Sequence, residues 1–109
     1  MDVEKARALI CVIEERSISA AANKMGYTPS GISRMMTSLE DELGFPLLIR
    51  KKEGASMTAD CRKMLPVIRD YIRSDEECLQ MAAKIRGMEV GNVTIGTAYS
   101  EYCLLYTSP

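Results

Sequence analysis

Two short helical patterns, separated by a break at residues 26–28, constrain the fold of this chain more than any other feature. They lie within the segment SISAAANKMGYTPSGISRMMTSLEDELG, residues 17–44. Ser19 is expected to cap a helix over residues 20–25, because a serine oxygen can accept a hydrogen bond from a free N–H at a helix start. Gly26 is expected to end that helix, since glycine readily adopts the left-handed conformation found there. Two short helices joined by so tight a turn form a helix-turn-helix pattern.

The second pattern predicts a helix over residues 29–43. Thr28 offers a capping hydroxyl, Pro29 suits the first helical position, and Gly44 is the expected stop. The spacing of its apolar residues predicts one buried face, made of Ile32, Met36, Leu39 and Leu43. The residues outside this stripe are small, hydroxylated or cationic: Ser30, Ser33, Arg34 and Thr37.

The acidic run of residues 40–42 lies at the end of this second helix, where the helix dipole disfavours anions. No local interaction in the sequence accounts for that placement.

One helix is predicted before this pair and a hairpin after it. Residues 3–16 follow Asp2, a candidate cap, and place one apolar stripe on a helix: Ala6, Leu9, Ile10 and Ile13. Residues 47–50 and 55–57 are candidate strands around a turn with a basic tip, residues 51–54. Three helices followed by a two-stranded hairpin predict a mostly α-helical fold, the winged helix-turn-helix.

A long helical pattern begins after Thr58, its expected cap, and continues to about residue 86. Pro66 lies well inside it, where proline is expected to kink or destabilise a helix. Apolar residues recur at three- and four-residue spacing: Met64, Leu65, Ile68, Tyr71, Ile72, Cys78, Leu79, Ala82 and Ile85. Because the preceding small domain cannot cover so long a stripe, a second copy of the helix is the expected partner. The residues expected at that dimer interface are Leu65, Ile68, Ile72, Leu79 and Ala82.

The C-terminal segment predicts the start of another structure. Gly87 and Gly91 bracket a break, residues 92–96 (NVTIG) are a candidate buried strand, and residues 97–106 a candidate helix start. One strand and part of a helix cannot form a domain. The expected organisation is therefore a winged helix-turn-helix domain over residues 1–58, a linker helix over residues 59–88 and an incomplete domain over residues 89–109.

Composition argues against an enzyme or a metalloprotein. The chain has 109 residues and no histidine, which removes the commonest general base. Its cysteines form no CxxC pair and offer no metal-ligand set, so no metal or cofactor is expected: Cys11, Cys61, Cys78 and Cys103.

Charge and hydropathy limit the partners and the location. The net charge of −1 argues against a protein that coats nucleic acid, although a local basic patch can still attract phosphate. No apolar run approaches the ~20 residues needed to span a bilayer, and the N-terminus does not follow the pattern of a signal peptide. No membrane association and a cytoplasmic location are therefore expected.

The polar residues of the second helix and the hairpin match what a DNA reader needs. In DNA-binding helix-turn-helix proteins, the start of the second helix enters the major groove. Thr28 and Ser30 are placed to reach phosphates or bases, and Arg34 can bind a guanine edge with two hydrogen bonds or hold a phosphate. The expected contacts to the flanking DNA backbone are the cations of the hairpin: Arg50, Lys51 and Lys52. Two alternatives stay open on spacing alone: a three-helix bundle with a solvated polar face, and a winged helix that binds another protein.

The chain also resembles the N-terminal part of a LysR-type transcriptional regulator. The most specific matches are Ala21-Ala22, Ile32-Ser33-Arg34, Leu39-Glu40, Leu43-Gly44, Leu47 and Arg50, followed in the same order by MTADCRKMLP and GNVTIG. The resemblance implies a dimeric regulator that binds double-stranded DNA, with tetramers formed only by the full-length protein. It implies a recognition helix that carries Thr28, Pro29, Ser30, Ser33, Arg34 and Thr37, and a wing that carries Arg50.

The resemblance further implies a ligand-sensing domain that is almost entirely missing from these 109 residues. A small-molecule inducer would bind only through that domain, where Tyr99 and Ser100 would fall on the first loop that faces it. Pro66 matches a proline frequent in the family's linker helix.

Overall fold

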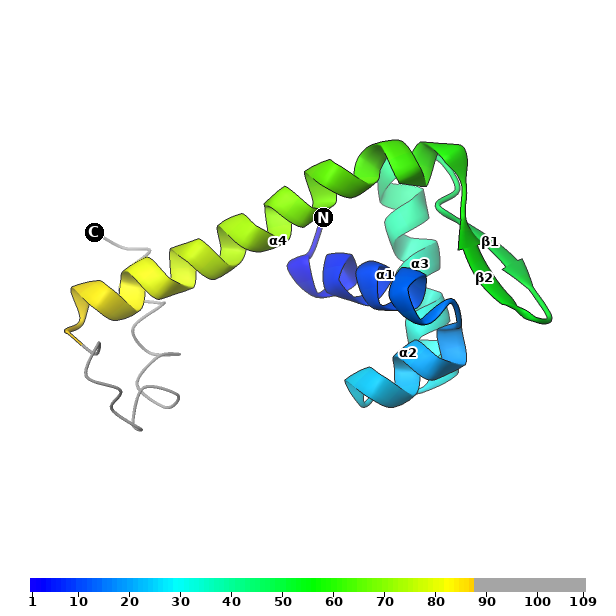
Figure 1. The fold of residues 1–109 in the computed structure, drawn as a ribbon, viewed down its shortest axis with the longest axis horizontal. Helices are drawn as coiled ribbons and strands as arrows, with labels where there is room; N and C mark the ends of the chain where they lie inside the picture. Colours follow the sequence, from blue (N-terminus) through cyan, green and yellow to red (C-terminus); the bar gives the residue numbers. More distant parts are fainter. Residues whose placement is uncertain (88–109) are drawn as a thin grey trace. The chain divides into compact units, whose positions relative to one another are not determined.

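The computed structural model of the chain describes residues 1–87. The predicted strand at residues 92–96, the helix expected after it, Tyr99, Ser100 and Cys103 lie outside the described residues. Six elements follow one another along the chain (Figure 1): α1 (Val3–Glu15), α2 (Ile18–Met25), α3 (Pro29–Leu43), β1 (Leu48–Lys51), β2 (Gly54–Met57) and α4 (Ala59–Ile85). This order confirms the predicted winged helix-turn-helix with a long helix behind it. One compact unit covers residues 1–72, and a second begins at residue 73.

The helix ends follow from local capping, with one error in the sequence-based expectation. Asp2 caps α1 by accepting from the Glu4 N–H, and Thr28 caps α3 by accepting from the Gly31 N–H at 3.0 Å. α2 is capped by Ser17, whose Oγ accepts from the Ala20 N–H at 3.0 Å. The prediction that Ser19 is the cap was wrong, because Ser17 captures that N–H and Ser19 falls in the first helical turn.

The core of the first unit lies where α1 meets α2, α3 and β2. Its fully or almost fully buried residues include Ala6, Leu9, Val12, Ala21, Ala22, Ile32, Met36, Leu39, Leu47 and Cys61. The stripe expected on α1 was partly wrong: Ala8 and Val12 are buried, whereas Ile10 and Ile13 are only partly buried. The reason is that α1 contacts α2, α3 and β2. Its buried face is therefore broader than the predicted stripe and is centred on other residues.

The hairpin β1–β2, called the wing below, is antiparallel and pairs Leu48 with Met57 and Arg50 with Ala55. β1 begins one residue later than predicted and extends through Lys51, because its pairing with β2 runs from Leu48 opposite Met57 to Lys51 opposite Gly54. The wing is fastened to the end of α1, since the Ala55 N–H donates to the Arg16 carbonyl at 3.0 Å. Gly54 makes this approach possible: its φ is +147°, and a Cβ there would lie 2.4 Å from the Arg16 oxygen.

The first part of α4 belongs to the same unit as the winged domain. Thr58 caps it as predicted by accepting from the Cys61 N–H at 3.1 Å, and the helix continues through Pro66. Ile68 is fully buried, and Met64 and Ile72 pack against the core. The core therefore extends beyond the expected domain boundary at residue 58. None of the helices in residues 1–87 is long and apolar enough to cross a membrane.

Candidate nucleic-acid interface

The start of α3 is open to solvent. Pro29, Ser30 and Arg34 are exposed. Thr28 is also exposed, but its Oγ1 already serves as the helix cap and lies 3.3 Å from Ser30 Oγ. Arg34 makes no hydrogen bond or ion pair with any residue of the described chain. A cation without a compensating carboxylate, one turn inside an exposed helix start, is available to an anionic or acceptor-rich partner.

Arg50 joins the wing to α3, a contact that the sequence did not predict. Its Nη1 donates to Ser33 Oγ at 2.8 Å and its Nη2 donates to Thr37 Oγ1 at 3.3 Å. These two hydroxyls lie one helical turn apart, so the forked guanidinium spans both. Three of the predicted DNA-contacting residues are thus brought together, but they are bonded to one another.

Glu40 holds this arrangement from the next turn of α3. Its Oε2 accepts from the Leu47 N–H at 2.7 Å and from the Leu48 N–H at 3.1 Å, while its Oε1 lies 3.7 Å from Arg50 Nη2. The Glu40 side chain is only 20% exposed, so water screens this pair less than a surface ion pair. Glu40 was not among the predicted site residues. Its only sequence signal was the Leu39-Glu40 match in the family resemblance.

The tip of the wing carries cations that have no partner within residues 1–87. Lys51 and Lys52 are exposed and make no polar contact with the rest of the described residues. A recess of about 140 Å³ separates the wing from the start of α2, and its polar lining comes from Ser17, Ser19, Arg50, Lys51 and Lys52. The two serines were not predicted as site residues, because only the folded chain places the wing beside the start of α2.

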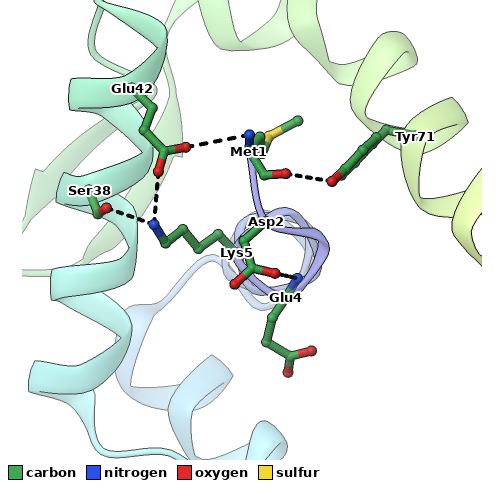
Figure 2. Close-up of polar contacts among 7 residues, drawn as sticks. All are labelled: Met1, Asp2, Glu4, Lys5, Ser38, Glu42 and Tyr71. Carbon is green, nitrogen blue, oxygen red and sulfur yellow. Dashed lines mark hydrogen bonds and ion pairs between the residues drawn. The ribbon is translucent and has the colours of Figure 1, made fainter. Parts of the chain in front are cut away.

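The opposite end of α3 carries a different polar cluster (Figure 2). Lys5 Nζ donates to Ser38 Oγ at 2.8 Å and to Glu42 Oε2 at 2.9 Å. The Met1 nitrogen lies 3.8 Å from Glu42 Oε1, and the Tyr71 hydroxyl donates to the Met1 carbonyl. The hydrogen bond from Lys5 lowers the pKa of Glu42 below its ordinary value. Glu40 and Glu42 therefore occupy the unfavourable end of α3 because each has a cationic partner from another part of the fold.

The turn between α2 and α3 is fastened to α1. The Tyr27 hydroxyl donates to Glu4 Oε2 at 2.7 Å, and this bond raises the pKa of Tyr27. Lys24 Nζ donates to Glu15 Oε2 at 3.1 Å, which raises the pKa of Lys24. The first contact joins the turn to α1, and the second joins α2 to the end of α1.

The residues predicted for a dimer interface lie in different environments along α4. Ile68 belongs to the core of its own chain, and Ile72 packs against that core. Leu65 and Leu79 are partly exposed, and Ala82 is buried. Three apolar side chains of α4 are mostly exposed: Val67, Met81 and Ile85.

Comparison with known proteins agrees with this geometry. Residues 3–62 match the family described as "Bacterial regulatory helix-turn-helix protein, lysR family". The HTH-type transcriptional regulator CzcR of Bacillus subtilis (strain 168) is 31% identical over 81 residues, which cover 74% of this chain and 28% of CzcR. The chain spans only about a third or less of the curated relatives it matches.

Solved structures show the same fold bound to DNA. The CbnR DBD in complex with DNA is 25% identical, with a TM-score of 0.70 over 84% of this chain and 100% of that chain. The BenM DBD in complex with benA site 1 DNA is 26% identical, with a TM-score of 0.72 over 79% of this chain and 97% of that one. The family description and the relatives are those of regulators rather than enzymes. The chain belongs to the lysR family of bacterial regulatory helix-turn-helix proteins.

Proposed function

We propose that the chain is the sequence-specific, double-stranded DNA-binding part of a LysR-type transcription regulator. The observation that carries this proposal is the exposed face formed by the start of α3 and the wing, where Arg34, Lys51 and Lys52 have no partner in the described chain. α3 enters the major groove and the wing lies along the flanking backbone. The CbnR and BenM complexes support this assignment, because similar chains of 25–26% identity were solved with DNA.

The proposed contacts divide into phosphate and base contacts. Lys51 and Lys52, with Ser17 and Ser19 across the recess, bind backbone phosphates. Thr28 and Pro29 set the start of the helix against the backbone. Base edges are contacted by Ser30, Ser33, Arg34 and Thr37.

The proposed active form is a homodimer built on α4, in a cytoplasmic protein. The partly exposed Leu65 and Leu79 face the partner helix, and the buried Ala82 lies on the same stripe of α4. Ile68 and Ile72 support α4 from the side of the winged domain. The two recognition helices then reach half-sites about 34–36 Å apart, or a multiple of that distance. Tetramer formation and inducer binding belong to a ligand-sensing domain beyond this chain.

The test is selection of binding sites from a random duplex library with the 109-residue chain, followed by affinity measurements at several salt concentrations. An enriched inverted repeat with salt-dependent affinity supports a dimeric DNA reader. An enriched single half-site supports sequence-specific DNA binding and contradicts the proposed dimerisation through α4. No enrichment and no salt-dependent binding contradicts the proposal and favours a protein-binding winged helix. The matched control is the Arg34→Ala, Lys51→Ala, Lys52→Ala triple variant, which retains every described polar contact and is expected to lose binding.

A further inference from the structure

The hydrogen bonds of Arg50 fix the polarity of two hydroxyls on the recognition helix. A hydroxyl carries one hydrogen to donate and two lone pairs to accept, whereas a guanidinium can only donate. Ser33 Oγ and Thr37 Oγ1 must therefore act as acceptors toward Arg50. No acceptor within the described chain takes the hydrogen of either hydroxyl.

The cationic donor also changes how each hydroxyl interacts with a third group. A charge-assisted bond on the oxygen polarises the hydroxyl, which strengthens its O–H as a donor and weakens its remaining lone pair as an acceptor. The nearby guanidinium charge disfavours amino hydrogens and favours lone pairs on whatever approaches. Ser33 and Thr37 are thereby biased toward donating.

Glu40 keeps Arg50 in this position. Its carboxylate is itself fixed by the N–H groups of Leu47 and Leu48, at 2.7 and 3.1 Å, and pairs with the guanidinium at 3.7 Å. Arg50 is therefore held between one carboxylate and two hydroxyls, all on successive turns of α3. This restraint distinguishes Arg50 from Lys51 and Lys52, which have no such partners in the part of the chain that the structure describes.

We propose that Arg50, held by Glu40, is a positioning residue that determines base specificity by making Ser33 and Thr37 hydrogen-bond donors. The inference rests on the proposed DNA-binding function. The major-groove edge of guanine offers two acceptors, N7 and O6, and no donor, whereas cytosine offers only an amino donor. Each hydroxyl is then expected to face a base that presents acceptors. Guanine is preferred for its two acceptors, and cytosine is rejected for its amino donor.

The experiment compares the sites selected by the wild-type chain and by four variants. Ser33→Ala and Thr37→Val locate the base positions that depend on each hydroxyl. At those positions, the wild type is expected to favour guanine over cytosine by about tenfold, within the range of single base contacts. Arg50→Lys keeps the charge but loses the fork, and is expected to reduce that preference to about twofold while the salt dependence of binding is unchanged. Glu40→Gln, which keeps an acceptor for the Leu47 and Leu48 N–H groups, is expected to relax the same positions.

A modified base tests the direction of the hydrogen bonds. Replacing guanine by 7-deazaguanine at the assigned position removes one acceptor without changing the base pair. The wild type is expected to lose about tenfold in affinity, and Arg50→Lys is expected to lose about twofold or less. Lys51→Ala is the control, because it removes a wing cation that touches neither hydroxyl and is expected to show the wild-type base preference.

Several results would overturn the inference. If Arg50→Lys kept the base preference, the fork of Arg50 would not orient the hydroxyls. If a further variant, Arg50→Gln, kept the base preference while the salt dependence fell, Arg50 would be a phosphate contact that leaves the hydroxyls on binding. No loss of wild-type affinity with 7-deazaguanine on either strand at the assigned positions would show that the hydroxyls do not donate to guanine. Circular dichroism of each variant separates a lost base preference from a lost fold. If Glu40→Gln unfolds, the base preference of Arg50→Lys, the mildest change, decides the proposal. If the wild type enriched no site at all, the proposed function itself would fail, which is a distinguishable result.

Discussion

The two ends of α3 contain similar polar residues and use them in opposite ways. At the C-terminal end, Lys5, Ser38 and Glu42 are bonded to one another, with Met1 and Tyr71 beside them (Figure 2). Around the N-terminal half, the cations Arg34, Lys51 and Lys52 have no partner in the described residues. The net charge of −1 is therefore an average. Charges at the C-terminal end of α3 are paired, whereas these cations around its N-terminal half are not paired within the described residues. Compensated charges stabilise the fold, and uncompensated cations are available to an anion.

Arg50 stands between these two cases. It is compensated by Glu40, yet it is bonded to two hydroxyls on the proposed DNA-facing helix. The comparison teaches that exposure alone does not identify a contact residue, because Arg50 and Lys51 are neighbours and both exposed. What differs is whether the rest of the fold has already satisfied the side chain.

Gly54→Ala should have the largest effect, because it displaces the whole wing from the N-terminal half of α3. The substitution forces a side chain into a φ of +147° and against the Arg16 oxygen, and we expect a loss of about 3 kcal/mol in the free energy of unfolding. Urea denaturation measures it. Gly26→Ala is the control, since its φ is +79° but no atom lies within 4 Å of the added carbon. Equal losses in the two variants would show that the wing moves aside without cost.

Arg34→Ala should sharpen the comparison by separating binding from stability. We expect specific binding to weaken by about 1–3 kcal/mol and one base position to relax, while the thermal midpoint stays unchanged because Arg34 has no described partner. Titration of the selected site and of a scrambled duplex measures both affinities. An equal fall on the two duplexes would make Arg34 a phosphate contact.

Lys51→Ala should have a smaller effect, confined to electrostatics. We expect the slope of log affinity against log salt to fall by about 1, with base preference unchanged. Lys63→Ala is the matched control, because Lys63 is an exposed lysine of α4 outside the proposed interface. An unchanged slope for Lys51→Ala would show that Lys51, at the tip of the wing, does not contact the DNA backbone.

Glu42→Gln should have the smallest effect, and it acts on the compensated end. Because Lys5 lowers the pKa of Glu42 below its ordinary 4.5, the ionised carboxylate stabilises the fold above that pH. This contribution is lost as the pH falls through the lowered pKa. We expect thermal unfolding from about pH 7 to about pH 3 to show a slightly flatter acid limb for the variant, with DNA affinity at neutral pH unchanged. An acid limb that is the same in the variant and the wild type would mean that Glu42 is not stabilised by Lys5 in solution.

Local interactions explain which parts of the fold the sequence could predict. The bounds of α3 were predicted correctly because Thr28, Pro29 and Gly44 act on residues next to them in the chain. The start of α2 was wrong because Ser17 and Ser19 are both plausible caps, and only the backbone geometry selects one. The acidic run at the end of α3 had no local explanation, since the partners of Glu40 and Glu42 lie in β1 and α1.

The sequence by itself determined the helix-turn-helix, the wing and the residues on the exposed face of α3, because capping and apolar periodicity depend on near neighbours. Only the tertiary structure decided which of those residues are free. It bonded Arg50 to Ser33 and Thr37 and left Arg34, Lys51 and Lys52 without partners among residues 1–87. The physical reason is that a hydrogen bond between residues 13 or 17 positions apart depends on how the hairpin docks on the helix. That docking is set by Gly54 against Arg16 and by Glu40 against Leu47, contacts that no local pattern encodes.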